Sequence, residues 1–116
     1  MGRPEVRFRV RVTRGEDIAV GPGKIALLEA IASAGSITAA AKGLGMSYRR
    51  AWLLVDTMNR SFRAPVVEAG AGGSHGGGAA LTPLGREVVE RYRRIESTAR
   101  QAAAADIHGL EALLRK

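Results

Sequence analysis

Apolar and charged residues alternate at the start of the chain, and helical spacing follows. From Val6 to Val12 the apolar positions are separated by Arg7, Arg9 and Arg11. This period of two puts apolar and charged side chains on opposite faces of a β-strand, so we expect a strand whose apolar face covers part of the core. Its arginine face has two interpretations, a solvated polar face or a surface for phosphate contact.

Three helix signals follow one another between residues 22 and 62. Apolar positions recur at helical spacing over residues 22–34, which predicts a first helix with an apolar stripe of Ile25, Leu28, Ile31 and Ala32. Ser36 is a suitable N-cap for a second helix through Leu44, and Ser47 caps a third that runs to about Phe62.

The remainder of the chain predicts a hairpin and a long helix. Residues 66–81 are typical of two short strands around a glycine-rich tip. The Thr82-Pro83 pair then starts a helix, in which threonine caps and proline occupies the first turn. Apolar spacing continues to about residue 104, roughly 34 Å at 1.5 Å per residue. The His108-Gly109 pair is expected to break the helix.

The long helix is predicted to be a dimerisation element. It exceeds what a head of about 70 residues can cover, and self-association in a two-fold dimer is the expected use of the excess. The alternative is an amphipathic helix that packs only on its own domain. The predicted dimer contacts are Leu84, Val88, Tyr92, Ile95 and Ala99.

This order of elements predicts a mainly α fold with a small antiparallel β-sheet, a winged helix-turn-helix with a long C-terminal dimerisation helix. A chain of 116 residues fits one domain. We divide it into an N-terminal strand at 1–14, three helices at 22–62, a wing at 66–81 and a C-terminal helical segment at 82–116.

The composition favours a polyanionic partner and argues against an enzyme. Eighteen Lys and Arg face 11 Asp and Glu, and the formal charge of +7 favours nucleic acid over an anionic membrane. Without cysteine, thiolate metal sites and disulfides are excluded. His75 and His108 lie in different segments, so we expect no catalytic cluster, metal site or cofactor. The lack of a signal peptide or membrane-spanning stretch favours a cytoplasmic protein without membrane contact.

Residues 40–54 match the helix-turn-helix pattern. Ala41 is small where two helices cross closely, and Gly45 allows a sharp turn. The core between the two helices is predicted to contain Ala40, Leu44, Met46, Ala51 and Leu54. On a helical wheel the buried face of the third helix carries Ala51, Leu54, Val55, Met58 and Phe62. Its opposite face is basic near the N-terminal end, as in a recognition helix that enters a major groove.

We therefore expect Arg49 and Arg50 to contact base edges, because arginine makes paired hydrogen bonds with guanine. The same helix supplies the further DNA-binding candidates Ser47, Tyr48 and Arg60. For Tyr48 a phosphate contact and packing are equally favoured, whereas Trp52 is predicted to pack at the edge of the core. Leu53 lies on the face that should meet DNA, where it would touch a thymine methyl unless the wheel is slightly displaced.

The glycine-rich tract is predicted to be the tip of a wing. It lacks the Lys-Ser/Thr pair of a P-loop and the surroundings of a dinucleotide site. Beside a helix-turn-helix, Ser74 or His75 would meet the DNA backbone or minor groove, and the alternative is a merely flexible loop. Ser36 and Thr38, at the start of the second helix, are expected to hold phosphates.

Several short motifs resemble the DNA-binding domain of ModE-type molybdate-responsive transcriptional regulators. The most specific is Ser47-Tyr48-x-x-Ala51-Trp52, followed by Met58-Asn59, the glycine-rich wing and Leu81-Thr82-Pro83-Leu84-Gly85. The resemblance extends from the N-terminal strand to at least Tyr92, and LysR-type regulators share its helix-turn-helix part. It implies a winged-helix dimer on an inverted-repeat operator near genes of molybdate transport or molybdenum-cofactor metabolism.

The resemblance also implies where an effector would bind. In ModE proteins the oxyanion is bound by C-terminal Mop domains, and this sequence ends at Lys116 without them. We therefore expect neither molybdate nor another oxyanion effector on these residues. The position after the tryptophan, acidic in ModE proteins, is Leu53 here.

Two other functions remain open at this point. A winged-helix adaptor would dock a protein and use its basic charge for solubility. A small oxyanion-binding protein would use the glycine tract. Binding to duplex DNA at two salt concentrations separates the adaptor from the regulator.

Overall fold

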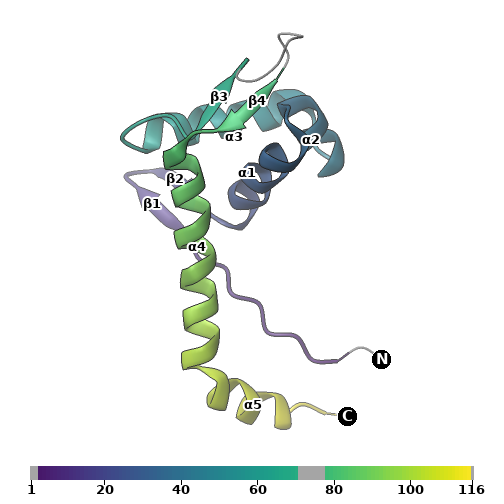
Figure 1. The fold of residues 1–116 in the computed structure, drawn as a ribbon. Coiled ribbons are helices and arrows are strands. Elements are labelled where there is room, and N and C mark those ends of the chain that lie inside the picture. The colour runs from purple at the N-terminus through teal and green to yellow at the C-terminus, as the bar shows by residue number, and fades with distance from the viewer. Residues whose placement is uncertain (1–2, 71–77, 116) are drawn as a thin grey trace.

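A computed structural model describes residues 3–70 and 78–115. A compact head of three helices and two hairpins is joined to a long helix that projects away from it (Figure 1). The elements in chain order are β1 (Val12–Arg14), β2 (Asp17–Val20), α1 (Pro22–Ala34), α2 (Ile37–Gly43), α3 (Tyr48–Ser61), β3 (Val67–Ala69), β4 (Ala79–Leu81), α4 (Pro83–Ala102) and α5 (Ala104–Ala112). The mainly α fold with small antiparallel sheets confirms the prediction, and the molecule measures 54 × 32 × 24 Å.

The predicted N-terminal strand is wrong over most of its length. Only Val12–Arg14 forms a strand, which pairs in antiparallel fashion with β2, a partner the sequence pattern did not indicate. Residues 3–11 have no strand partner and run beside α4 instead (Figure 1). The Tyr92 hydroxyl donates to the Val10 carbonyl at 2.7 Å, and Arg100 donates to the Val6 carbonyl at 2.9 Å. The alternating pattern predicted an extended backbone, but it could not show whether a neighbouring strand was available for pairing.

Two of the three head helices, α2 and α3, begin where their capping serines predicted. The Ser36 hydroxyl accepts from the Ala39 N–H at 3.0 Å, and the Ser47 hydroxyl accepts from the Arg50 N–H at 3.1 Å. Each serine thereby satisfies one of the free N–H groups at the start of its helix. These two caps fix the first turns of α2 and α3.

The core lies around α1, which α2, α3, α4, β2 and β4 surround. Ile25, Leu27, Leu28 and Ile31 are fully buried, so Leu27 belongs to the core although the predicted apolar stripe did not contain it. Ala32, which did belong to that stripe, is exposed. A helix enclosed on several sides buries more than one stripe, so periodicity alone underestimates its buried face.

The predicted wing contains the antiparallel pair β3–β4, in which Val67 faces Leu81 and Ala69 faces Ala79. The tip residues Ser74 and His75 lie outside the described residues. A backbone hydrogen bond connects the hairpin to the head, in which the Ala79 N–H donates to the Gly35 carbonyl at 2.9 Å.

The long helix starts as predicted and ends earlier. Thr82 caps α4, its hydroxyl accepting from the Gly85 N–H at 3.0 Å. The break falls at Ala103, and the predicted break at His108-Gly109 is wrong because both residues lie inside α5. No helix among the described residues is long and apolar enough to cross a membrane.

Candidate nucleic-acid interface

The turn between α2 and α3 presents the start of α3 at the surface. Gly45 has a φ of 70°, a left-handed conformation that glycine adopts without a steric penalty. The Met46 N–H then donates back to the Ala41 carbonyl at 3.0 Å, which closes the turn. Ala40 and Ala41 are buried as expected, but Leu44 is 40% exposed and does not close the core.

The faces of α3 are divided as the wheel predicted. Ala51, Val55 and Met58 are buried, and Leu54 and Phe62 are partly buried against the core. The prediction that Trp52 packs at the core edge is wrong, because 47% of it is exposed.

The exposed side of α3 combines arginines with large apolar groups. Tyr48 is 53% exposed and Leu53 is 47% exposed, and both Arg49 and Arg50 are exposed. Tyr48, Trp52 and Leu53 can therefore touch a partner directly. This surface has both charged donors and apolar groups, the two kinds of contact that distinguish base pairs in a major groove.

Ion pairs divide the arginines of α3 into two kinds. Arg60 pairs with Asp56 at 3.1 Å in the i,i+4 arrangement. Within the described ranges, neither Arg49 nor Arg50 forms an ion pair. The N-terminal end of the helix therefore has two guanidinium groups available for an anionic partner, whereas the charge of Arg60 is partly compensated.

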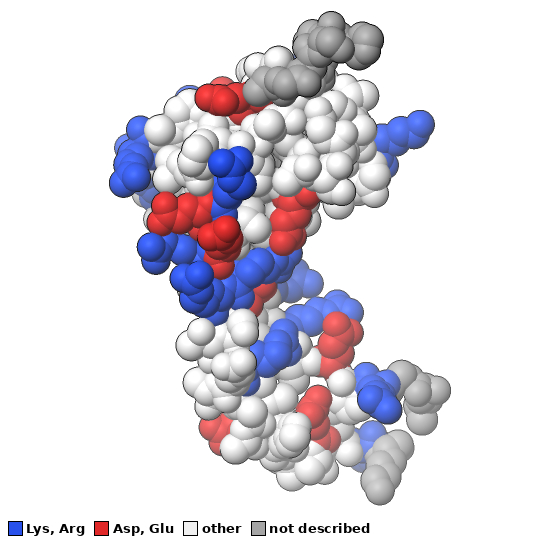
Figure 2. Space-filling model, viewed as in Figure 1, with Lys and Arg blue, Asp and Glu red and all other residues white. Residues whose placement is uncertain are grey.

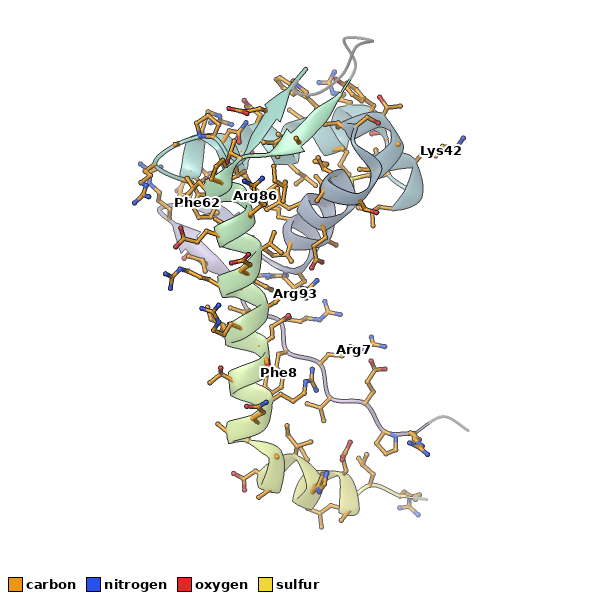
Figure 3. The ribbon with its side chains drawn as sticks, viewed as in Figure 1. Arg7, Phe8, Lys42, Phe62, Arg86 and Arg93 are labelled. Atoms are coloured by element: carbon orange, nitrogen blue, oxygen red, sulfur yellow. The ribbon has the colours of Figure 1, made fainter. Side chains whose placement is uncertain are left out.

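The helix α2 directly precedes α3 in the sequence, and its start carries the residues expected to contact phosphates. Thr38 is exposed, whereas Ser36 is half-buried and its hydroxyl serves as the helix cap. Lys42, which sequence reasoning did not select, projects from α2 away from the rest of the head (Figure 3). Its place in the last turn of a short capped helix was the available signal.

The predicted dimer residues occupy two environments on α4. Leu84 and Val88 pack against the core, and Tyr92 is only 2% exposed, so these three stabilise the protomer itself. Ile95 is 49% exposed and lies with Ala99 in a surface groove whose other lining residues are Arg91, Arg94 and Thr98. The apolar surface of α4 left for another molecule therefore lies in its second half.

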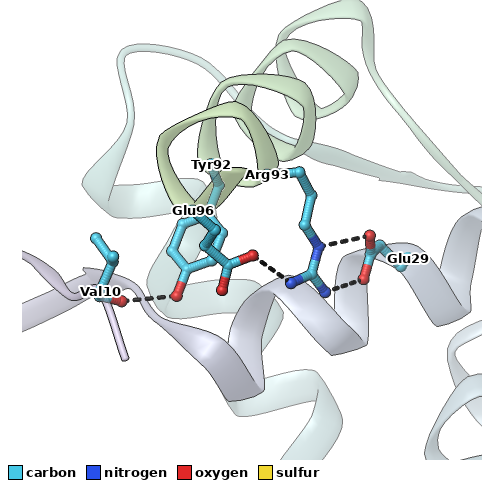
Figure 4. A network of polar contacts seen from close by, with 5 residues as sticks. All are labelled: Val10, Glu29, Tyr92, Arg93 and Glu96. Carbon is cyan, nitrogen blue, oxygen red and sulfur yellow. Dashed lines mark hydrogen bonds and ion pairs between the residues drawn. The ribbon is translucent and has the colours of Figure 1, made fainter. Parts of the chain in front are cut away.

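Polar contacts fix α4 against α1. Arg93 binds both carboxylate oxygens of Glu29, with Nε at 3.0 Å, and also contacts Glu96 at 2.7 Å (Figure 4). The hydrogen bond with Arg93 lowers the pKa of Glu29, and the two carboxylates raise the pKa of Arg93. Burial raises the pKa of Tyr92. Basic and acidic side chains alternate on the visible face where α4 leaves the head (Figure 2).

Asn59 is a second residue that sequence reasoning left without a role. Its side chain accepts hydrogen bonds from the Val66 and Val67 N–H groups at 2.8 and 3.2 Å, and it donates to the Val67 carbonyl at 3.3 Å. Two sequence signals marked this residue: its place in the Met58-Asn59 motif, and its position near the end of a helix just before a proline-containing connection.

Comparison with known proteins places this geometry among DNA-binding regulators. Residues 23–86 match the model of the bacterial regulatory helix-turn-helix proteins of the lysR family. The chain is 49% identical over 67% of its length to the molybdenum-pterin-binding protein MopB of Rhodobacter capsulatus, and 45% identical over 78% to the molybdenum transport protein ModE of Azotobacter vinelandii. It spans 29% and 34% of those two proteins, about a third of their length.

A solved structure supports the same assignment. The crystal structure of the CbnR_DBD–DNA complex superposes with a TM-score of 0.58 at 25% identity, over 76% of this chain and 95% of that one. The matched protein is in complex with DNA.

Proposed function

Since the chain belongs to the lysR family of bacterial regulatory helix-turn-helix proteins, we propose that it is a sequence-specific transcriptional regulator that binds an inverted-repeat operator as a dimer. The family is regulatory and not enzymatic, and the chain is a helix-turn-helix DNA-binding domain related to ModE regulators and Mop proteins. Beyond this assignment, we propose the type of operator, the dimer and the residues that make each contact.

The observation that carries the proposal is the exposed N-terminal end of α3. Arg49 and Arg50 lie in its first turn, beside the exposed Tyr48, and the described residues compensate neither arginine in an ion pair. Residues in the first turn of a recognition helix reach base edges, and arginine pairs with guanine through two hydrogen bonds. We assign base contacts to the two arginines and a base or phosphate contact to the tyrosine.

Phosphate contacts around this helix would set its register on the duplex. We assign them to Ser36, Thr38 and Lys42 of α2, to Ser47 and Arg60 of α3, and to Ser74 and His75 of the wing. The hydroxyls of Ser36 and Ser47 already accept a cap hydrogen bond, and each retains a proton to donate. The Arg60 guanidinium would contact a phosphate while it is also paired with the Asp56 carboxylate.

The second half of α4 supports the dimer. Ile95 and Ala99 form an apolar surface that the described part of the protomer does not cover, and α4 extends beyond the head. Two copies joined there by a two-fold axis would place their α3 helices on successive major grooves of an inverted repeat.

The relatives support a link to molybdenum. Proteins described as a molybdenum transport protein and molybdenum-pterin-binding proteins match at 42% to 49% identity. We propose that the operator lies near genes of molybdate transport or molybdenum metabolism. Because the match covers about a third of each relative, this link concerns the genes controlled and assigns no oxyanion site to these residues.

Selection of bound sites from a random duplex library tests the proposal. We expect enrichment of an inverted repeat, and a search of the encoding genome for that repeat tests the molybdenum link. Binding to the selected duplex should weaken with salt with a log-log slope of about −0.9 per phosphate contacted. The Arg49→Ala/Arg50→Ala double variant should lose the preference for the selected site, while an Arg3→Ala/Arg14→Ala variant with the same charge should keep it.

The opposite result would favour a protein-docking adaptor. No enriched sequence, together with binding that is indifferent to salt, would contradict a DNA-binding regulator. Enrichment of a single half-site without an inverted repeat would contradict only the dimer.

A further inference from the structure

The connection between the recognition helix and the wing is fixed by side chains at both ends. Val66 is fully buried, so its backbone N–H and carbonyl both need partners within the protein. Asn59 supplies the partner of the N–H, and the Thr82 N–H donates to the carbonyl at 3.0 Å. The 65–67 segment is therefore held by α3 on one side and by the start of α4 on the other.

On the α4 side, the first turn of the helix lies in close contact with the backbone of the 65–67 segment. The Thr82 hydroxyl donates to the Pro65 carbonyl at 2.7 Å and accepts from the Gly85 N–H at 3.0 Å. A Cβ at position 85 would overlap the Val66 carbonyl. This contact leaves α4 little freedom to shift relative to the 65–67 segment.

On the α3 side, the amide of Asn59 makes the side-chain hydrogen bonds to the 65–67 segment. Asn59 accepts from two backbone N–H groups and donates to one carbonyl, so the orientation of its amide is fixed. It is half-buried and directed at the wing, so its polar atoms are engaged inside the protein and not on the exposed face of Tyr48, Arg49 and Arg50.

We propose that Asn59 is a positioning residue that sets the angle between the recognition helix α3 and the dimer helix α4, and thereby the half-site spacing that the dimer accepts. The role rests on the proposed function. In a two-fold dimer joined through α4, the separation of the two recognition helices depends on how each α3 is held relative to its own α4. Asn59 connects α3 to the 65–67 segment, and Thr82 with Gly85 connects that segment to α4.

The proposal makes a prediction that loss of stability alone does not make. A destabilised variant weakens binding equally on all duplexes, because it lowers the folded fraction only. A variant with a looser α3–α4 angle fits a wrongly spaced operator more easily, so it loses discrimination between spacings. It keeps the half-site sequence preference, since the base-contacting residues of α3 are unchanged.

The experiment measures affinity for a series of operators with half-sites moved one or two base pairs closer or farther apart. The wild-type protein should lose about tenfold in affinity for each step, comparable to one mismatched base pair. Asn59→Ala should lose about threefold or less per step, with an unchanged ranking of half-site sequences. All proteins are compared well below their unfolding temperatures, which circular dichroism establishes.

Two further variants keep the test decisive. Thr82→Val removes both hydroxyl bonds, the one to the Pro65 carbonyl and the one from the Gly85 N–H, and should flatten the spacing profile in the same way. If Asn59→Ala does not fold, a Thr82→Val profile as sharp as that of the wild type overturns the coupling of α3 to α4 through the 65–67 segment, and the role of Asn59 with it. Ile25→Val is the control, because Ile25 is fully buried in α1, ten residues before the Gly35 that touches the wing. It should lower stability and leave the spacing profile as sharp as that of the wild type.

The outcomes separate the two proposals. A wild-type protein with a sharp spacing optimum and an Asn59→Ala variant with an equally sharp one would overturn the positioning role alone. A wild-type protein that binds no inverted repeat would overturn the proposed dimeric operator binding, and the positioning role with it. A flattened profile in both variants with a sharp Ile25→Val profile is the expected result.

Discussion

Arg49 presents a guanidinium group in the first turn of α3, where the described residues leave it without an ion pair. If it pairs with a guanine, Arg49→Ala should cost about 1–3 kcal/mol and relax specificity at one operator position. A binding assay over single-base operator variants measures both effects. Arg14→Ala, an exposed arginine of β1, is the control for loss of one positive charge. Equal weakening on all duplexes would make Arg49 a phosphate contact.

At Gly85, helix propensity and packing predict opposite effects of an alanine substitution on the free energy of unfolding. Alanine in a helix is favoured over glycine by about 1 kcal/mol. However, a Cβ at position 85 would overlap the Val66 carbonyl, which is backbone and cannot rotate away. We therefore expect Gly85→Ala to destabilise the protein by about 1–3 kcal/mol, as overpacking does, in urea unfolding.

Gly23 provides the matched control for this substitution. It lies in the first turn of α1, and a Cβ there meets no atom within 4 Å. Gly23→Ala should be neutral or raise the unfolding free energy by up to about 0.5–1 kcal/mol. If the two variants have the same stability, the close approach of α4 to Val66 does not constrain the fold.

The sequence predicted which side chains of α3 are buried more reliably than what the exposed ones do. Hydrophobic spacing identified Ala51, Val55 and Met58, because burial follows the helical period. It misplaced Trp52, which lies at the border of the stripe, where a shift of a few degrees decides exposure. The hydrogen-bonding role of Asn59 could not be predicted from spacing, since its partners are backbone atoms seven and eight residues away.

The helix α4 is attached to α1 by the ion pair of Arg93 with Glu29, which is expected to be lost in acid. Contact with Arg93 lowers the pKa of Glu29 in the folded protein. A carboxyl group with a lowered folded-state pKa stabilises the protein above its unfolded pKa of about 4.3, and the contribution is lost as the pH falls through the folded value. The stabilisation should therefore be present at neutral pH and absent in strong acid.

The variant Glu29→Gln tests this attachment. Because the Arg93 and Glu29 side chains are 45% and 39% exposed, solvent screening limits the expected loss to about 0.5–1 kcal/mol at neutral pH. Urea unfolding at about pH 7 and about pH 2.5 should show a difference from the wild type only at the higher pH. Glu90→Gln on α4, the helix that carries Arg93, removes an exposed carboxylate outside the ion pairs of the described residues and should show none at either pH. A difference that persists in acid would indicate lost packing instead.

Element boundaries were predictable where a local hydrogen bond fixes them. Ser36, Ser47 and Thr82 each cap a helix, and the cap is a contact with a residue three positions later. Whether residues 6–12 form a strand depends on distant partners, whereas the break at Ala103 had no sequence signal that we recognised. Alternation cannot show whether an edge is available for pairing, and the segment at 3–11 instead lies along α4 through Tyr92 and Arg100.

The protein is elongated, and the residues that the structure describes leave part of α4 uncovered. The first half of α4 packs on the head through Leu84, Val88 and Tyr92, and this use was not separable in the sequence from dimer contacts. Both halves have the same apolar spacing, so only the three-dimensional extent of the head distinguishes them. The dimer prediction is therefore confined to Ile95 and Ala99.

Substitution of Ile95 by lysine tests that surface. Arg91 and Arg94 line the same groove, so a further cation is both desolvated and repelled if two copies meet there. We expect Ile95→Lys to weaken dimerisation by about 100-fold or more, equivalent to about 2.7 kcal/mol, in sedimentation equilibrium. Its affinity for the inverted repeat should fall to that for one half-site. Ile18→Lys in β2, at 38% exposure against 49%, is the matched control and should remain dimeric. A dimeric Ile95→Lys protein would show that α4 does not associate through its second half.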